Sequence, residues 1–394
     1  MRNKIFLVLL CAGMLFSCKS AIVNESSESG TVSPIYIRSP SFFWMLRPWK
    51  KRTLATMDGR ARFAELSFVG RSRIRIRPLV NFPLERIDRR LVVAPEAGVC
   101  ITQSSYKFHV ADISSGKTKS FAPLRTWRFS EGTPSIFDSV NGLICFGYYS
   151  QDHSNRMSSY NIIYDPKNDR ILYESPERGE LISFIFSFTS ELTLTVRYND
   201  DMRDFFFYNW RTQELTRNEL TEKITSLGLM FDLRPGRNIN PVERFLFADI
   251  GKLGEQKNVK LTWDENYEDV TVIPMDYLIP EGKRLNDITL SADGKWATTF
   301  VSGYYGLYGE MLVKRAFFHL DGRYPNGISM PVFADDYDVN RAEQGSFVEH
   351  PVHGWCFAEE KRREDNGSEK LYLRLYKMSD VLEEINRQLL TKAK

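Results

Sequence analysis

Two pairs of adjacent carboxylates are the residues of this chain best suited to hydrolytic chemistry. Hydrolases often use one carboxyl group as a general acid and a second one as base or nucleophile. Both pairs lie in polar stretches that the sequence predicts to be loops, where adjacent acids are commonly solvent-exposed turn residues. We therefore assign no catalytic residue and keep these acids as alternative catalytic candidates: Asp200, Asp201, Asp335 and Asp336.

Histidine and cysteine do not add a second site. His350 and His353 are separated by two residues, and no third ligand follows at the spacing of a zinc site. Cys100, Cys145 and Cys356 each follow a glycine by two or three residues. This predicts equivalent strand positions in different repeats, with buried thiols rather than disulfides. The sequence predicts no metal and no cofactor, and it lacks a G-x-S-x-G elbow and a phosphate-binding glycine loop.

The N-terminal segment is typical of an export signal that ends in a modified cysteine. Two basic residues precede an apolar run over residues 5–16, which is too short to span a bilayer core of about 30 Å. The tetrad at residues 15–18 (LFSC) resembles the lipobox of bacterial lipoproteins. The resemblance implies cleavage before Cys18, a diacylglycerol thioether on its sulfur, and a lipid-anchored envelope protein. Lys19 at the next position favours the outer membrane, with the periplasmic or outer face left open.

Charge is concentrated just after the predicted tether. Residues 38–90 contain 14 Lys or Arg against 4 Asp or Glu, and aromatic residues interrupt the basic ones over residues 42–52. One interpretation is a basic surface that meets anionic lipid or an acidic partner. The alternative is that the aromatic side chains are core and the charges a solvated rim. Because the basic region is local and the chain is predicted to be exported, we expect no nucleic-acid partner.

The remaining sequence repeats a strand-turn-strand plan. Hairpins with apolar residues at every second position occur at residues 106–121, 160–173, 204–217, 259–273 and 315–330. Partner hairpins occur at residues 91–103, 135–149, 181–198, 286–301 and 346–358, and the unit near residues 244–273 is the most degraded. Four strands in every 45 to 57 residues or so is the spacing of a propeller blade. The chain is therefore predicted to be all-β, a β-propeller of four-stranded blades, six in number with seven as the alternative.

The turn at residues 291–296 (SADGKW) resembles the S-x-D-G-K turn of TolB-like propeller repeats. Together with the lipobox, it makes the chain similar to lipid-anchored TolB-like six-bladed propellers. The resemblance implies an interaction scaffold and supplies no catalytic residues.

The predicted closure of the ring involves both ends of the chain. After a strand at residues 371–376, Ser379 is a candidate N-cap for a short helix whose apolar stripe is Val381, Leu382, Ile385 and Leu389. The last blade then lacks a strand, and residues 71–77, which alternate Arg with other residues, are predicted to supply it. The predicted domains are a signal peptide (1–17), a tether (18–33) and a propeller (34–394). Within the propeller, residues 34–90 close the ring and 91–394 form the blades.

Topology then predicts a binding face. Connections between second and third strands emerge on the same face of every blade, and tyrosines recur there, with a charged loop over residues 359–369. Tyrosine combines a large contact area with a polar tip and little rotamer entropy. The candidate binding residues are Tyr148, Tyr149, Tyr198, Tyr304, Tyr305 and Tyr308; the alternative is that those at 304–308 pack between blades.

Two functional hypotheses remain. The first is a lipid-anchored cell-envelope propeller that binds a protein or envelope component and has no enzymatic activity. The second is an envelope hydrolase or lyase that acts on glycan or peptide with the loop carboxylates around the axial channel. We expect a monomer in either case.

Overall fold

A computed structural model describes most of the chain from Thr31 onward. Residues 31–394 form one compact unit. The predicted signal peptide, Cys18 and nearly all of the predicted tether lie outside the described residues. The described residues are 31–39, 43–49, 52–57, 62–81, 92–94, 98–104, 107–121, 130–138, 142–151, 157–174, 182–187, 192–199, 202–227, 239–240, 244–250, 257–266, 269–278, 283–305, 310–335, 345–365 and 368–392.

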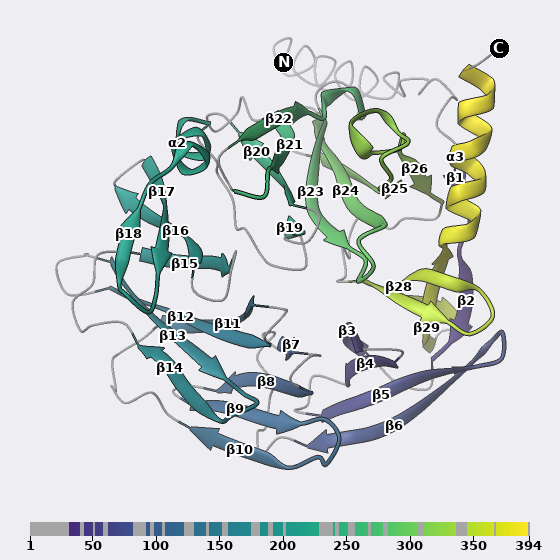
Figure 1. Ribbon diagram of the computed structural model, residues 1–394. Helices are drawn as coiled ribbons and strands as arrows, with labels where there is room; N and C mark the ends of the chain where they lie inside the picture. The colour runs from purple at the N-terminus through teal and green to yellow at the C-terminus, as the bar shows by residue number, and fades with distance from the viewer. Residues whose placement is uncertain are drawn as a thin grey trace, which may run out of the picture. The chain divides into compact units, whose positions relative to one another are not determined.

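The described strands form seven sheets, numbered I to VII here in chain order (Figure 1). Sheet I contains β3 (Phe43–Trp49), β4 (Arg52–Met57), β5 (Arg62–Val69) and β6 (Arg73–Asn81). Sheet II contains β7 (Val92–Ala94), β8 (Val99–Ser104), β9 (Lys107–Asp112) and β10 (Thr118–Phe121). Sheet III contains β11 (Ser130–Asp138), β12 (Leu143–Gln151), β13 (Met157–Asp165) and β14 (Arg170–Glu174). Sheet IV contains β15 (Ile182–Ser187), β16 (Leu192–Asn199), β17 (Met202–Asn209) and β18 (Glu214–Thr216).

The remaining three sheets complete the series. Sheet V contains β19 (Ile239–Asn240), β20 (Phe245–Ile250), β21 (Lys257–Trp263) and β22 (Val270–Pro274). Sheet VI contains β23 (Lys283–Leu290), β24 (Trp296–Tyr305), β25 (Glu310–His319), β26 (Val332–Ala334) and the N-terminal β1 (Thr31–Val32). Sheet VII contains β27 (Ser346–His350), β28 (Gly354–Asp365), β29 (Ser368–Lys377) and the N-terminal β2 (Ile35–Arg38). Two short 3-10 helices, η1 (Asp276–Leu278) and η2 (Pro325–Gly327), lie in connections.

Each sheet packs against the next one along the chain. Buried side chains of sheets III and IV share one core cluster, and the same holds for IV with V, V with VI, VI with VII, and VII with I. β11 contacts β7 and β8, which joins sheets II and III. At the boundary of sheets I and II, a Cβ placed on Gly116 would lie only 2.9 Å from the carbonyl oxygen of Leu79. Successive antiparallel meanders that pack face to face are the organisation of a β-propeller.

Glycine turns mark the same connection in four sheets. Gly98, Gly142 and Gly294 lie between the first and second strands of sheets II, III and VI, Gly354 is the first residue of the second strand of sheet VII, and all four have a φ near +70°. This left-handed conformation favours glycine. In the turn before β24, the backbone N–H of Trp296 donates to Ser291 Oγ at 2.9 Å. The predicted equivalence of these turns is confirmed.

An N-terminal strand pairs with the C-terminal sheet, but it is not the predicted one. β2 runs antiparallel to β29, with Ile35 opposite Leu375 and Ile37 opposite Leu373. The predicted segment, residues 71–77, instead lies in and just before β6 and pairs with β5. The prediction was wrong because residues 43–81 contain four alternating strands, enough for a complete sheet of their own. The alternating Ile35 and Ile37 give β2 its one apolar face.

Helix α3 (Met378–Lys392) follows β29 directly, as predicted. Val381 and Ile385 are buried against sheets VI and VII, whereas Leu389 at the far end is exposed, which corrects that part of the predicted stripe. Ser379 lies inside the helix rather than at its N-cap. No described helix is long and apolar enough to span a membrane.

A second helix, α2 (Glu219–Ser226), was not predicted. It begins with a capping box: the Thr221 N–H donates to Asn218 Oδ1 at 3.0 Å, and the Asn218 N–H donates to Thr221 Oγ1 at 2.9 Å. Leu220 and Ile224 are buried between sheets IV and V. The capping residues were a local signal that the strand pattern on either side obscured.

The pairing of β2 predicts an effect on stability. Ile37 is 1% exposed in the core between sheets VII and I. We expect Ile37→Ala to lower the free energy of unfolding by about 3 kcal/mol, because it leaves a cavity there. Arg38→Ala, on the exposed face of the same strand, should change it by less than about 0.5 kcal/mol. Urea denaturation measures both, and equal small losses would mean that β2 does not pair in solution.

Candidate functional site

Five of the six candidate tyrosines lie at the same place in their sheets. Tyr148 and Tyr149 fall near the end of β12, Tyr198 near the end of β16, and Tyr304 and Tyr305 at the end of β24. Each of these strands is the second of its sheet, and each leads into the connection to the third. The topology therefore brings these residues to equivalent hairpin ends. Tyr308 lies outside the described residues.

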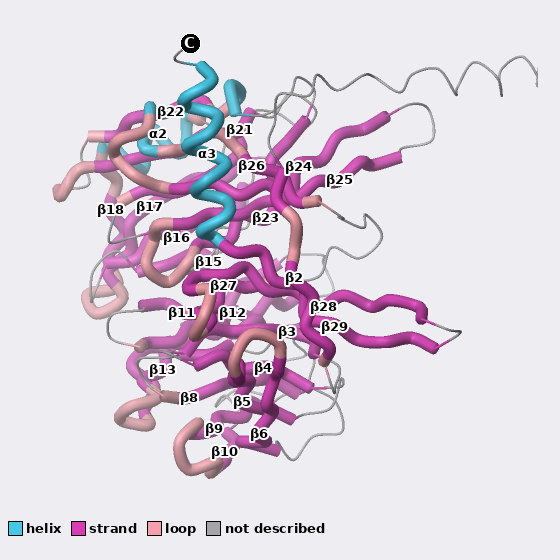
Figure 2. The backbone as a smooth tube through the Cα atoms, turned by 90° about the vertical axis from the view of Figure 1, so that its right-hand side faces the viewer, coloured by secondary structure: helices cyan, strands magenta, loops and turns pink. Residues whose placement is uncertain are grey.

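The two ends of each sheet differ in character. We call the end that carries the second-to-third connections the hairpin face. The opposite end carries the first-to-second and third-to-fourth connections, and we call it the turn face. Figure 2 shows the β24–β25 and β28–β29 hairpins projecting to one side, at the right, with the described tight turns at the left. The candidate tyrosines belong to the hairpin face.

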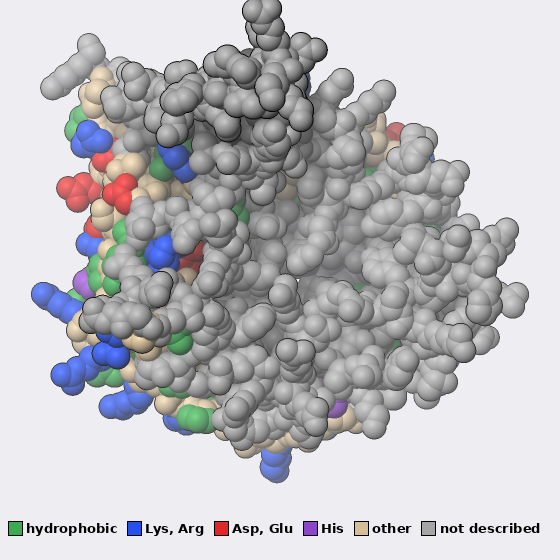
Figure 3. All heavy atoms as spheres, turned by 180° about the vertical axis from the view of Figure 1, so that it is seen from behind, with side chains coloured by type: hydrophobic (Ala, Val, Ile, Leu, Met, Phe, Trp, Pro, Cys, Tyr) green, Lys and Arg blue, Asp and Glu red, His purple; other side chains and the backbone are tan. Residues whose placement is uncertain are grey.

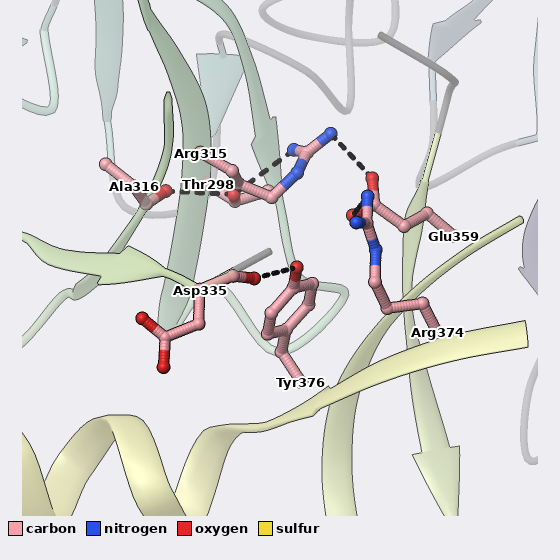
Figure 4. Close-up of polar contacts among 7 residues, drawn as sticks. All are labelled: Thr298, Arg315, Ala316, Asp335, Glu359, Arg374 and Tyr376. Carbon is pink, nitrogen blue, oxygen red and sulfur yellow. Dashed lines mark hydrogen bonds and ion pairs between the residues drawn. The ribbon is translucent and has the colours of Figure 1, made fainter. Parts of the chain in front are cut away.

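The candidate acids are distributed differently. Asp200, Asp201 and Asp336 lie outside the described residues. Asp335 directly follows β26, and its Oδ2 accepts a hydrogen bond from Ser33 Oγ at 2.8 Å. Its backbone carbonyl accepts one from the Tyr376 hydroxyl at 3.1 Å (Figure 4). Asp335 therefore connects the N-terminal segment to sheets VI and VII.

The predicted charged loop over residues 359–369 is not a loop. β28 continues to Asp365 and β29 begins at Ser368, so the segment is a long antiparallel hairpin. Glu359 is 1% exposed. Charged residues at both alternating positions concealed the strand period, and the prediction was wrong for that reason.

Glu359 instead forms a buried cluster with two arginines from different sheets (Figure 4). Arg315 Nη2, on β25, lies 3.0 Å from Glu359 Oε2, and Arg374 Nη2, on β29, lies 2.7 Å from Oε1. All three side chains are at most 3% exposed. Arg315 Nη1 also donates to Thr298 Oγ1 at 3.3 Å, and that hydroxyl donates to the Ala316 carbonyl at 2.9 Å.

Aromatic rings cover the Arg315 guanidinium. Its central carbon lies 4.1 Å from the centroid of the Phe300 ring and 4.3 Å from that of Phe357. Such contacts are strongest where water is excluded. The carboxylate of Glu359 accepts from one guanidinium on each oxygen, so the arrangement joins sheets VI and VII electrostatically. The sequence offered a faint signal, since Arg315 and Arg374 each interrupt an apolar stretch of a strand.

The buried histidines have structural surroundings. His109 Nδ1 lies 2.7 Å from Ser120 Oγ, and His319 Nδ1 lies 3.0 Å from the Tyr324 hydroxyl. His350 Nδ1 accepts backbone N–H groups of Val352 and His353 at 3.1 and 3.2 Å, so the neutral ring carries its proton on Nε2. Among the described residues, no three His, Cys, Asp or Glu side chains gather as a metal site would require.

The three cysteines of the body are buried and free. Burial raises the pKa of the Cys145 and Cys356 thiols to about 12 and that of Cys100 further still. A thiol that stays protonated is a poor nucleophile. The predicted role of these residues as small hydrophobic side chains is confirmed.

A small apolar cavity lies between sheets V and VI. Its volume is about 10 Å³, and its lining includes Phe247, Met275, Ile288 and Phe318. This is room for one water-sized molecule, so the cavity belongs to the core and does not accept a substrate.

Comparison with known proteins gives distant structural likeness only. No family model matches the chain, and no curated protein matches it. It is similar to a prolyl endopeptidase (8% identity, TM-score 0.46), with 88% of this chain covered; the match spans half of that protein. It is also similar to the β-propeller domain of the Trilobed protease from Pyrococcus furiosus (8% identity, TM-score 0.45, 84% and 95% of the two chains), described as having an open velcro topology. A third likeness is to the Dos1 propeller (12% identity, TM-score 0.43, 86% and 79%).

The buried cluster predicts a large effect from a small change. Glu359→Gln removes the negative charge that both buried guanidinium groups contact, and we expect it to lower the free energy of unfolding by about 3 kcal/mol or more. The control is Glu265→Gln in the exposed Arg244–Glu265 pair, whose loss should cost less than about 1 kcal/mol. Replacing all three side chains of the cluster by Met or Leu should restore much of the loss. Equal effects of Glu359→Gln and Glu265→Gln would contradict this role.

His350 predicts a pH dependence. Burial, and then the charge of His353, lowers its pKa to about 4, against about 6.5 for an unfolded histidine. The unfolded chain therefore binds the proton first, and stability is lost as the pH falls from about 6.5 toward 4, by up to about 3 kcal/mol. His350→Asn keeps a hydrogen-bond acceptor but does not titrate, so its unfolding free energy should fall less steeply over this range. Parallel pH profiles for the two proteins would refute the assignment.

Proposed function

We propose that the chain is a lipid-anchored β-propeller of the bacterial cell envelope that acts as a binding module. Its partner is a protein or another envelope component held at the hairpin face. The single observation that carries the proposal is the convergence of tyrosines on equivalent hairpin ends of sheets III, IV and VI. Repeated hairpins on one face give a broad surface, and tyrosine is enriched among residues that dominate binding energy.

The architecture supports a rigid scaffold for this surface. We take each of the seven sheets as one blade. The proposed number of blades is therefore seven, which was the alternative to the six expected from the sequence. β2 supplies the outer strand of sheet VII, while β1 extends sheet VI, and we propose that β2 thereby closes the ring. The Ser291–Trp296 turn supports the TolB-like resemblance at the level of a repeat, although seven blades depart from its six-bladed form.

The anchor is the second part of the proposal. Cys18 follows an export signal and a lipobox-like tetrad, and a stretch of Ser, Glu and Gly separates it from the body. We propose a diacylglycerol thioether on Cys18, an outer-membrane location and a monomeric body. The tether would let the propeller stand off the membrane while it holds its partner.

The hydrolase hypothesis depends on Asp200, Asp201, Asp335 and Asp336. Asp335 is engaged by Ser33, and it follows β26, the fourth strand of sheet VI, whereas the innermost strand of a blade is the first. Its position therefore favours a structural role over one at the axial channel. The binding function is accordingly the one that we propose, without catalytic activity.

Affinity capture from crosslinked envelope extract tests the binding function. We expect the wild-type chain to sediment with membranes and to retain a partner identified by mass spectrometry. The double variant Tyr304→Ala/Tyr305→Ala should remain membrane-bound, but the amount of captured partner should fall at least about 30-fold. The variant Cys18→Ser should release the chain from membranes. Tyr277→Ala, at an exposed tyrosine between sheets V and VI, is the matched control and should retain the partner.

Each outcome separates the parts of the proposal. Loss of the partner in both tyrosine variants would point to general destabilisation, which urea denaturation would reveal. Absence of any captured partner would overturn the binding function and direct the work to Asp200→Asn/Asp201→Asn and a screen for hydrolysis. A membrane-bound Cys18→Ser protein would overturn the lipid anchor alone.

A further inference from the structure

We propose that a patch on the turn face of sheets I and VII rests on an anionic lipid surface, so that the hairpin face points away from the membrane. The proposal rests on the proposed function, because it assigns the side of the propeller that the anchored chain turns to its membrane. The patch consists of two exposed valines and three exposed arginines: Val69, Val352, Arg71, Arg73 and Arg75.

The two halves of the patch come from neighbouring turns. The turn between β5 and β6 carries Arg71, and the turn between β27 and β28 carries Val352. Just before these turns, the Phe68 ring lies 4.6 Å from the His350 ring, measured between centroids. Burial, followed by the charges of Lys377 and Arg71, lowers the pKa of His353, so Arg71 is within electrostatic reach of the second turn. Sheets I and VII therefore present one continuous surface here.

The apolar part of the patch is unusual for this protein. Val69 is 40% exposed and Val352 is 47% exposed. Among the described residues, only five large hydrophobic side chains are at least 40% exposed, and two of them are these valines at the end of β5 and in the turn before β28. Aliphatic side chains beside basic ones suit the boundary between lipid headgroups and acyl chains.

The basic part of the patch lacks ion-pair partners among the described residues. Arg71, Arg73 and Arg75 are exposed, and none of them forms an ion pair within the described part of the chain, whereas Arg77 pairs with Glu65. Figure 3, which views the molecule from behind, shows Lys and Arg side chains gathered at its lower left. This side corresponds to the right-hand edge of Figure 1, where the β5–β6 turn lies. Guanidinium groups bind phosphate in a bidentate manner, and each basic residue adds to the attraction of an anionic membrane.

The entry of the chain favours the same orientation. β26 begins at the turn face, and β1 runs parallel to it. β2 begins opposite Leu375, near the end of β29 that lies at the turn face. The chain therefore enters the body from the turn face, and β2 contacts β6, the strand that carries Arg73 and Arg75. Twelve residues lie between Cys18 and Thr31, a reach of at most about 45 Å. A lipid on Cys18 would thus hold the patch near the membrane surface.

Charged residues on an outer strand can also serve only to prevent edge-to-edge pairing of sheets. That role explains Arg73 and Arg75 on β6. It does not explain the exposed valines on the adjoining turns, and it predicts no preference for anionic lipid. The two roles therefore differ in a measurable quantity.

The test is vesicle partitioning of the full-length chain carrying Cys18→Ser, which removes any thioether lipid. Vesicles of phosphatidylcholine are compared with vesicles of equal parts phosphatidylcholine and phosphatidylglycerol. The ratio of the two partition coefficients isolates the anion-dependent part, since the apolar N-terminal segment is common to every sample. We expect a ratio well above one that falls roughly 30-fold in Arg71→Gln/Arg73→Gln and that declines with added salt.

The control is Arg170→Gln/Lys257→Gln, which removes two exposed basic residues of sheets III and V. It should lower the ratio by less than about threefold. An unchanged ratio in Arg71→Gln/Arg73→Gln, or an equal fall in the control, would overturn the patch as the lipid-facing surface. Because every sample carries Cys18→Ser, the result is independent of the anchor, and a failed anchor would be detected separately by the membrane fractionation above.

Discussion

The C-terminal sheet of this protein has three strands of its own, and the strand that completes it comes from the beginning of the body. β2 pairs with β29 across more than three hundred residues of sequence. Ile37 then becomes part of the core shared by sheets VII and I. Contacts between such distant residues carry a loop-closure cost that only the complete set of sheets repays. Through this pairing, the last sheet along the chain and sheet I share one core.

Polar contacts reinforce the same region. Ser33 donates to Asp335, Tyr376 donates to the carbonyl of that residue, and the Arg315–Glu359–Arg374 cluster lies between the same two sheets. A buried ion cluster contributes little net free energy compared with apolar packing, but it is costly to misalign. It therefore favours one register of sheets VI and VII, and with it the position of the β24–β25 and β28–β29 hairpins on the proposed binding face.

The two faces of the protein divide its proposed work. The hairpin face carries tyrosines on sheets III, IV and VI, at the ends of their second strands. The turn face carries the exposed Val69 and Val352 beside arginines that form no ion pair among the described residues, and the chain enters the body on that side. An anchored module that turns one face to lipid leaves the other free for a partner. The topology of a four-stranded meander produces this division, since its connections alternate between the two ends of the sheet.

The sequence by itself determined the strand plan, the glycine turns, the buried cysteines and the terminal helix, because period-two alternation and left-handed glycines are local properties of the chain. It did not reveal Glu359 as a buried residue, because charges on both sides of a strand erase that alternation. It also placed the closing strand at residues 71–77 instead of β2, since either segment has the pattern of an outer strand. Only the tertiary structure could decide between them, because the choice depends on which segment buries its apolar face against sheet VII and which completes a sheet of its own.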